Sequence, residues 1–244
     1  MHCQPNHNHE VYIWLKSKHI CLLCDEFSDA PFPVCVACET ELPWLGDQCL
    51  QCALPLPVSG MNCGQCLKRP PAFTEVIAPW LYDFPVDSLI TRFKHQSRWP
   101  MGRLLAELAG QFLQHRFDEG LARPDCLLPV PLATRRLRQR GYNQAGMLAG
   151  WLGKALNLPV DEHRLLRTRE TTAQQGLDAK TRKRNLNGAF KVVDEAWMQG
   201  KHLALVDDVL TTGSTADVIA RTLLRSGARR VDVYCLARTP RPEG

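Results

Sequence analysis

The chain contains no long apolar run and few tyrosines and tryptophans. No stretch of its 244 residues approaches the roughly 18 consecutive apolar residues that a membrane-spanning helix requires. Residues 1–20 carry scattered histidines and lysines, and the apolar run Val11–Leu15 is too short for a secretory signal. These absences predict a cytoplasmic protein without membrane insertion. Four tyrosines and six tryptophans serve the whole chain, which disfavours a protein that binds its partners mainly by base stacking.

Cysteine is abundant, and it is concentrated near the start of the chain. Eight of the 11 cysteines form four Cys-x-x-Cys pairs: Cys21/Cys24, Cys35/Cys38, Cys49/Cys52 and Cys63/Cys66. In a reducing compartment, such pairs are metal ligands or redox groups rather than structural disulfides. Because Zn²⁺ takes four thiolates in a tetrahedron, eight cysteines predict two structural zinc sites with no ligand position left open.

The equal spacing of the pairs leaves their partnering open. Sequential pairing would place Cys21, Cys24, Cys35 and Cys38 on one ion and Cys49, Cys52, Cys63 and Cys66 on the other. An interleaved cross-brace is the alternative. Cys126 and Cys235 lie in apolar runs, and we expect them to be small buried hydrophobic residues rather than ligands.

The chain is expected to have a weakly ordered start over residues 1–20, a zinc module over 21–70 and an α/β domain over 71–240. A segment as short as 21–70 buries too little apolar surface to fold without a staple. Further along, apolar spacing predicts alternating strands and helices. The strands are Thr74–Tyr82, Cys126–Val130, Leu203–Val206 and Arg230–Ala237, and the helices are Val86–His95, Gly102–Phe117, Gln144–Leu156 and Ser214–Arg225, with a break at Trp99-Pro100. This alternation predicts a mostly parallel sheet covered on both faces.

A second strong signal is the segment LALVDDVLTTGSTAD, from Leu203 to Asp217. A buried strand brings Asp207 and Asp208 to the carboxyl edge of the sheet, where open α/β folds bind ligands. The turn that follows opens a helix, whose N–H groups and dipole suit a phosphate. Its residues are Thr211, Thr212, Gly213, Ser214 and Thr215. The pattern predicts a ribose-phosphate site, and the competing interpretation is an ordinary strand–turn–helix with Ser214 as N-cap.

This segment resembles the signature of the type I phosphoribosyltransferases, which bind 5-phosphoribosyl 1-diphosphate. The resemblance implies that Asp207 and Asp208 contact the ribose hydroxyls and that the turn from Thr211 to Thr215 cradles the 5′-phosphate. Some purine-salvage members carry an acid at the position of Thr211, where it serves as a base. This chain has threonine there, so the resemblance assigns no catalytic residue.

Two more segments, PVPLATRRLRQRGYNQA (Pro129 to Ala145) and RETTAQQGLDAKTRKRNLNGAF (Arg169 to Phe190), resemble the ComF/GntX family. The cysteine module ahead of them matches as well, so the resemblance covers roughly residues 21–240. It implies a phosphoribosyltransferase-type fold behind an N-terminal double zinc ribbon. It also implies a role in competence, DNA uptake or DNA utilisation, with single-stranded DNA and DNA-uptake proteins as partners.

The net charge is +5, and arginines gather in two segments. The first comprises Arg135, Arg136, Arg138 and Arg140, followed by Tyr142 and Asn143. These residues are predicted to contact a diphosphate or a nucleic-acid backbone, against the alternative of a solvated basic loop. Asn143 is also a plausible N-cap of the next helix. The second arginine segment lies where phosphoribosyltransferases carry a mobile hood. The resemblance assigns to that hood Arg169, Thr171, Gln174 and Arg182.

Three functions follow from these features. The first is a phosphoribosyl diphosphate-binding protein that handles single-stranded DNA during uptake or utilisation. The second is an active Mg²⁺-dependent phosphoribosyltransferase with an unknown nucleobase or other acceptor. The third is a metabolic sensor that signals through the zinc module to a protein partner.

Overall fold

The computed structural model describes residues 19–169 and 188–241. The chain divides into two compact units, Met1–Leu42 and Pro43–Gly244. This boundary falls between the two groups of cysteines, so the second group belongs to the same unit as the central sheet. The boundary expected near residue 70 lies inside that second unit.

The described part of the first unit consists of very short elements. Strand β1 (His19–Ile20) pairs antiparallel with β2 (Phe27–Ser28), and helix α1 (Val36–Thr40) follows. Among its described residues, those that are buried are Cys21, Ser28, Val34 and Leu42. A unit with so little buried apolar surface depends on another source of stability.

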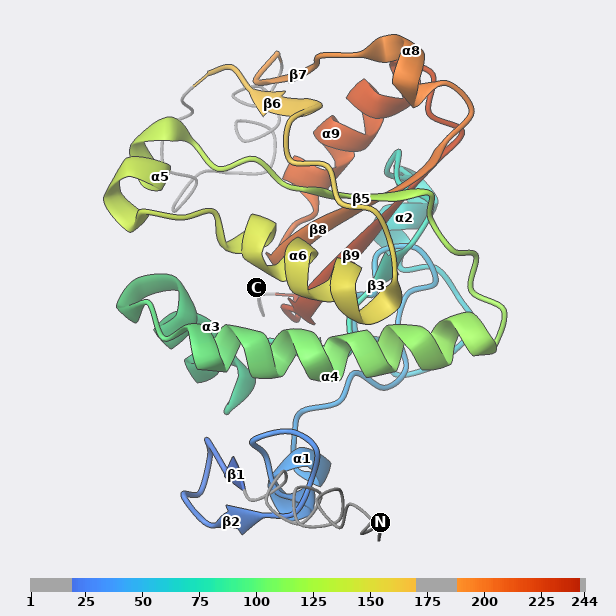
Figure 1. Cartoon of the computed structure of the whole chain (residues 1–244). Helices are drawn as coiled ribbons and strands as arrows, with labels where there is room; N and C mark the ends of the chain where they lie inside the picture. The colour runs from blue at the N-terminus through green and yellow to red at the C-terminus, as the bar shows by residue number, and fades with distance from the viewer. Residues whose placement is uncertain (1–18, 170–187, 242–244) are drawn as a thin grey trace, which may run out of the picture. The chain divides into compact units, whose positions relative to one another are not determined.

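A parallel sheet forms the centre of the second unit (Figure 1). Its spatial order is β3-β9-β8-β5, and β4 also pairs with β9. Every pairing among these strands is parallel. The strands are β3 (Val76–Ile77), β4 (Trp80–Leu81), β5 (Cys126–Pro129), β8 (His202–Leu210) and β9 (Arg230–Arg238). The two long central strands, β8 and β9, are mostly buried, as expected of a parallel sheet that is covered on both faces.

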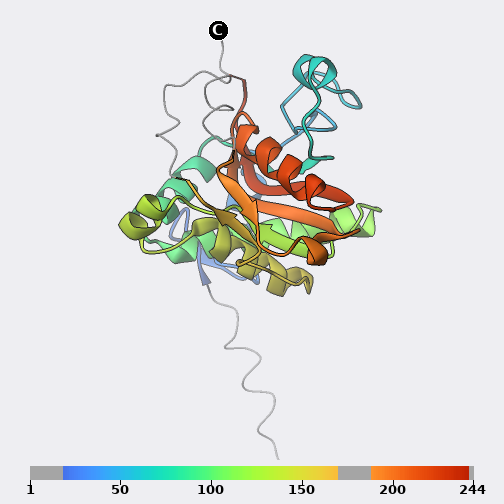
Figure 2. The same ribbon diagram turned by 90° about the horizontal axis from the view of Figure 1, so that it is seen from above.

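Helices cover both faces of this sheet. Figures 1 and 2 show α4 (Trp99–Asp118) and α6 (Gln144–Leu156) on one face and α9 (Ser214–Arg225) on the other. The other elements are α2 (Gly64–Lys68), α3 (Val86–Gln96), α5 (Thr134–Arg140), α8 (Glu195–Met198) and the antiparallel pair β6 (Leu165–Arg167) and β7 (Phe190–Val192). None of the helices in the described ranges combines the length and the apolar character that a membrane crossing requires.

The predicted α/β fold with a mostly parallel sheet is confirmed, and the departures from it have local causes. The expected strand Thr74–Tyr82 is split into β3 and β4 around Pro79, because proline cannot donate a ladder hydrogen bond. The break between α3 and α4 lies at Ser97, which adopts a left-handed conformation with φ of 52°. Pro100 instead occupies the first turn of α4, where a missing N–H costs nothing.

A polar network, buried at His202 and Asp232, closes the amino-terminal end of β8 and β9. His202 Nε2 lies 2.6 Å from Asp232 Oδ2, and both residues are buried. Arg230 pairs with Asp232 at 3.0 Å and also with Glu75. These partners satisfy the buried carboxylate of Asp232, which would be costly to bury alone. The opposite, carboxyl edge is the end at which sheets of this kind bind ligands.

Helix α6 provides a matched test of this packing. A β-carbon at Gly153 would lie 2.4 Å from Val160 Cγ2, whereas one at Gly150 would meet nothing within 4 Å. We expect Gly153→Ala to lower the free energy of unfolding by about 1–3 kcal/mol through overpacking. Gly150→Ala should be neutral or stabilising by up to about 1 kcal/mol. Urea unfolding of both variants measures the difference, and equal stabilities would contradict the close packing of α6 on the Val160 segment.

Candidate functional site

A cavity of about 1960 Å³ lies at the carboxyl edge of the sheet. The loops after β5 and β8 form much of its wall, which continues onto Cys52 and Cys66 of the second cysteine group. Its lining includes every residue predicted for the ribose-phosphate site: Asp207, Asp208, Thr211, Thr212, Gly213, Ser214 and Thr215. The volume exceeds the roughly 300–1,000 Å³ of an ordinary small-molecule pocket.

The two acids lie within strand β8, which continues to Leu210 and is longer than the predicted Leu203–Val206. Since strand side chains alternate, Asp207 and Asp208 point to opposite faces. Asp208 forms an ion pair of 3.0 Å with Lys94 of α3 and is buried. Its other carboxylate oxygen, Oδ2, is buried without a hydrogen-bond partner among the described residues. A buried acceptor of this kind is costly unless a ligand supplies a donor.

Asp207 has a markedly perturbed acidity. Burial, reinforced by the charge of Asp208, raises the pKa of Asp207 to about 7. Its Oδ1 accepts a hydrogen bond of 2.9 Å from the Asp208 N–H, which acts in the opposite direction. Asp207 therefore changes charge near neutral pH, at the wall of the cavity.

The hydroxyl-rich turn begins α9 without a side-chain cap. Gly213, with φ of 71°, is the N-cap residue, so the alternative in which Ser214 caps the helix is wrong. The Thr212 and Ser214 hydroxyls lie 2.9 Å apart. The helix N-terminus thus presents N–H groups and hydroxyls on the cavity wall, which is the arrangement that binds phosphate.

The predicted arginine segment forms helix α5 rather than a loop. Arg136 and Arg140 line the cavity, whereas Arg135 and Arg138 are not among its lining residues. Tyr142 donates its hydroxyl hydrogen bond to the Phe93 carbonyl. Asn143 caps α6 by accepting from the Ala145 N–H at 3.2 Å, as predicted, and donates to the Val130 carbonyl. The polar groups of Tyr142 and Asn143 are therefore engaged with backbone.

The predicted hood falls mainly outside the described residues. Thr171, Gln174 and Arg182 belong to the part of the chain that is not described. Arg169 is described, and its carbonyl accepts a hydrogen bond of 3.4 Å from Arg167, which lines the cavity. Strands β6 and β7 pair at the two ends of this segment.

Arg238, at the end of β9, is a cavity residue that sequence reasoning missed. It is 6% exposed. Its Nη1 donates to the Leu210 and Thr211 carbonyls at 3.1 and 2.6 Å, which holds the start of the hydroxyl-rich turn that is predicted to bind phosphate. The arginine that follows the run VYCLA, from Val233 to Ala237, is the signal that could have indicated it. Lys94 was missed as well, because it lies on a helix predicted from apolar spacing alone.

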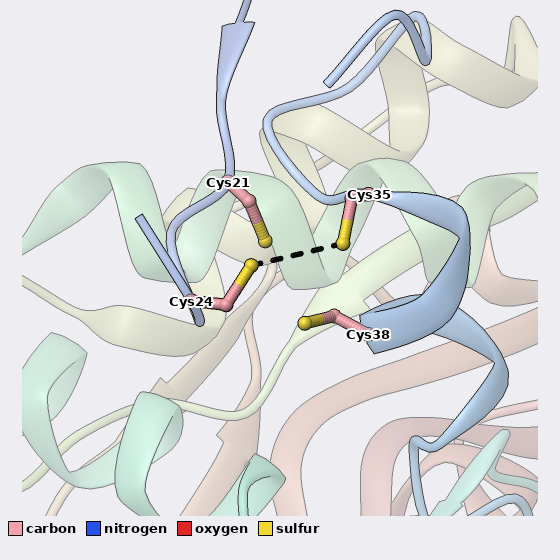
Figure 3. A group of neighbouring side chains, drawn as sticks. All are labelled: Cys21, Cys24, Cys35 and Cys38. Atoms are coloured by element: carbon pink, nitrogen blue, oxygen red, sulfur yellow. Dashed lines mark hydrogen bonds between the residues drawn. The ribbon is translucent and has the colours of Figure 1, made fainter. Parts of the chain in front are cut away.

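The cysteines form two separate groups of four. One contains Cys21, Cys24, Cys35 and Cys38, the other Cys49, Cys52, Cys63 and Cys66, and within each group the sulfur atoms lie within 4.8 Å of one another. Figure 3 shows the sulfurs of the first group converging, with Cys24 and Cys35 3.8 Å apart. The pairs are therefore combined sequentially, and the cross-brace alternative is wrong.

Each group suits a metal ion. Four sulfurs match the coordination number and donor type of a structural zinc site. Burial raises the pKa of the Cys49 thiol, but hydrogen bonds from backbone N–H groups of Cys52, Cys63 and Gln51 outweigh it and bring the pKa to about 7. Burial, followed by neighbouring thiolate charge, raises the pKa of Cys66. All four sulfurs can be thiolates together only if a cation compensates them.

Comparison with known proteins identifies the family. The chain is 40% identical over 174 residues to DNA utilization protein YhgH of Escherichia coli strain K12, a match that covers 71% of this chain and 76% of that protein. It is 34% identical over 240 residues to competence protein F of Haemophilus influenzae, across 98% of this chain and 96% of that one. The chain belongs to the ComF/GntX family. No family model matches this ComF/GntX chain.

Similarity to solved structures is weaker. Over 55% of its length, the ComF/GntX chain is similar to glutamine phosphoribosylpyrophosphate amidotransferase from B. subtilis, at 21% identity with a TM-score of 0.36, across 25% of that chain. It is also similar to a hypoxanthine phosphoribosyltransferase from Staphylococcus aureus, at 13% identity with a TM-score of 0.35, covering 56% and 64% of the two chains. Likeness at this level carries no inference about what the ComF/GntX chain does.

The acidity of Asp207 predicts a pH-dependent loss of stability. Because its folded pKa, about 7, lies above the unfolded value of about 3.9, the folded state binds the proton more tightly. The resulting stabilisation is fully present below pH of about 4 and is lost as the pH rises through about 7. Relative to Asp207→Asn, the wild type should lose at most about 1.4 kcal/mol for each unit of pKa difference.

Urea unfolding at several pH values between these limits measures this difference. Asp118→Asn, at an exposed position on α4, is the control and should follow the wild-type profile. Parallel profiles for the wild type and Asp207→Asn would show that the Asp207 carboxyl is not perturbed.

The cysteine groups predict a metal stoichiometry. We expect one ion in each group, and therefore two for each chain, by elemental analysis of the purified protein. Replacing both Cys21 and Cys24 by serine should leave one ion, and replacing both Cys63 and Cys66 should also leave one. Cys126→Ala is the control, because that thiol is buried outside both groups and should not change the metal content. A fully metal-free wild-type protein contradicts the assignment.

Proposed function

We propose that this ComF/GntX chain binds 5-phosphoribosyl 1-diphosphate, or a related ribose phosphate, and handles single-stranded DNA during DNA uptake or utilisation. The observation that carries the ligand is the buried, unpartnered Oδ2 of Asp208 beside the uncapped start of α9. The names of the relatives, DNA utilization protein and competence protein F, support the role in DNA use. The proposal also places one Zn²⁺ ion in each of the two cysteine groups.

The chemistry of the cavity fits such a ligand. The ribose hydroxyls would donate to Asp207 and to the free oxygen of Asp208, which would remove the cost of a buried acceptor. The 5′-phosphate would accept from the N–H groups and hydroxyls at the start of α9, where the helix dipole is favourable. Lys94 pairs with Oδ1 of Asp208, which leaves Oδ2 able to accept.

The basic wall of the cavity supports a second anionic group. Arg136 and Arg140 of α5, together with Arg167, line the same cavity as the turn. Guanidinium groups can hold a diphosphate two oxygens at a time. Mg²⁺ would be bound mainly by the diphosphate. Asp207 and Asp208 are the only adjacent carboxylates among the described lining residues, and Lys94 already pairs with Asp208, so the protein alone offers the cation too few free carboxylates.

A transferase activity is the second candidate, and His95 favours it. This residue lines the cavity, and burial followed by the charges of Arg140 and Lys94 lowers the pKa of its imidazole. A neutral imidazole near pH 7 can accept a proton from an attacking group. The rest of the lining would stabilise the charge that develops as diphosphate leaves, mainly through electrostatics.

Calorimetry tests the ligand site. Wild-type protein should bind phosphoribosyl diphosphate with Mg²⁺, and Asp208→Asn should weaken binding at least tenfold because it removes the charge that Lys94 and the ribose hydroxyls share. Asp118→Asn, far from the lining residues, should bind as the wild type does. Equal affinities for the wild type and Asp208→Asn would exclude this site. Product formation across a panel of nucleobases, lost in His95→Gln, would favour the transferase.

Filter binding tests the contact with DNA. Neutralising the α5 arginines as Arg135→Gln, Arg136→Gln, Arg138→Gln and Arg140→Gln should weaken binding of single-stranded DNA and lower the salt slope by about 3, at roughly 0.7 for each phosphate contact. A variant with the same charge change at four exposed arginines outside the cavity, Arg92, Arg103, Arg225 and Arg229, is the control. If both variants bind equally well, α5 is not the DNA contact.

A further inference from the structure

One buried guanidinium connects the second cysteine group to the phosphate-binding turn. Arg238 Nε donates a hydrogen bond of 2.9 Å to the Cys52 carbonyl. Its Nη1 donates to the Leu210 and Thr211 carbonyls on the other side and to the Thr239 carbonyl at 2.7 Å. A planar guanidinium holds its donors in one rigid fork, so these carbonyls keep a fixed arrangement relative to one another.

In the part of the chain that the structure describes, the charge of Arg238 has no anionic partner. Within residues 19–169 and 188–241, no carboxylate forms an ion pair with it. The side chain is nine-tenths buried and lines the cavity. A buried cation whose partners are all neutral carbonyls and hydroxyls is stabilised when an anion enters the same cavity. The position of Arg238 therefore affects both the binding of a phosphate ligand and the hydrogen bond to Cys52.

Three further contacts lie between the same two regions. The Gln51 amide, inside the Cys49–Cys52 turn, donates to the Phe73 carbonyl at 3.2 Å. The Phe73 ring lies against Gly213, where a β-carbon would be 3.6 Å from it. Ala72 donates its N–H to Asp217 Oδ1 at 2.8 Å, in the first turn of α9. The cysteine turn and the phosphate-binding turn are therefore joined at several points.

Metal binding would fix the position of the Cys52 carbonyl. Cys52 supplies one of the four sulfurs of its group, and Ala53 behind it is fully buried in the main core with a left-handed φ of 53°. With a cation in place, the sulfur and the core hold this turn from both sides. Without the cation, the four sulfurs, which lie within 4.8 Å of one another, are no longer held together by a metal ion. The Cys52 carbonyl, which accepts from Arg238, is then held in place only by the core.

We propose that Arg238 couples metal binding at the second cysteine group to ligand binding in the cavity. Each event strengthens the other, by the same factor in both directions as linkage requires. The first cysteine group lies in the other unit and takes no part. This inference rests on the proposed ribose-phosphate site and goes beyond it, because it assigns a positioning role to Arg238 and a regulatory one to Cys49, Cys52, Cys63 and Cys66.

The test follows zinc release from the full-length, zinc-loaded protein into an excess of a coloured chelator, with and without saturating ribose 5-phosphate. Serine variants of Cys21 and Cys24, and of Cys63 and Cys66, assign the release phases to the two groups. Ribose 5-phosphate should slow release from the second group by about 5-fold or more, the lower end of usual coupling strengths. Release from the first group should not change.

Three variants isolate the role of Arg238. Arg238→Gln should release zinc from the second group at the same rate with and without ribose 5-phosphate. Arg238→Lys keeps the charge but not the fork, so it should still bind the sugar phosphate yet lose the slowing. Arg225→Gln, an exposed change on α9, should behave as the wild type.

Calorimetry of ribose 5-phosphate binding to the wild type distinguishes failure of the coupling from failure of the proposed function. If the wild type binds ribose 5-phosphate but zinc release is unchanged, or if Arg238→Lys retains the full slowing, the coupling through Arg238 is wrong and the ligand site stands. If neither ribose 5-phosphate nor phosphoribosyl diphosphate binds, the proposed function fails and the coupling fails with it; if only the diphosphate binds, it replaces ribose 5-phosphate in the release assay.

Discussion

Adjacent carboxylates at the end of a buried strand repel each other, and burial penalises the charge of each. In this protein the two carboxyl groups are stabilised in different ways. Lys94 of α3 compensates Asp208, while Asp207 holds a proton up to about neutral pH. The position of α3 against the sheet is thus part of the site, although α3 was predicted only as an amphipathic helix. One oxygen of Asp208, Oδ2, is left without a hydrogen-bond partner among the described residues, and this is the oxygen to which the proposed function assigns a ribose hydroxyl.

Residues outside the central sheet also line the cavity. Its wall runs from the start of α9 through Arg238 to Cys52 and Cys66, so the second cysteine group is part of the same structure as the phosphate-binding turn. The first group belongs to a separate unit with few buried residues. Four cysteine pairs that look like one repeated module therefore serve two different structural contexts.

Much of the fold could be predicted from the sequence, because apolar periodicity dominates in α6, α9 and the central strands. The hydroxyl-rich turn from Thr211 to Thr215 could be located from the sequence as well, because its residues are contiguous. What could not be predicted depends on contacts between distant segments. Arg238 and Lys94 reach the cavity from elements far from the turn in sequence, and no local pattern records that meeting. The grouping of the cysteines was open for the same reason, because equal spacing is compatible with both pairings.

The short strands β6 and β7 have a consequence for how relatives can diverge. They pair Arg167 with Phe190, so the chain leaves the cavity wall and returns to the body of the protein at neighbouring points. Closing a loop between two fixed ends costs only about 0.6 kcal/mol more for each doubling of its length. The length of the stretch between these two points can therefore change at little cost in free energy. Because both of its ends are fixed in one antiparallel pair, such a change leaves the central sheet and the cavity-lining residues of β8 unaltered.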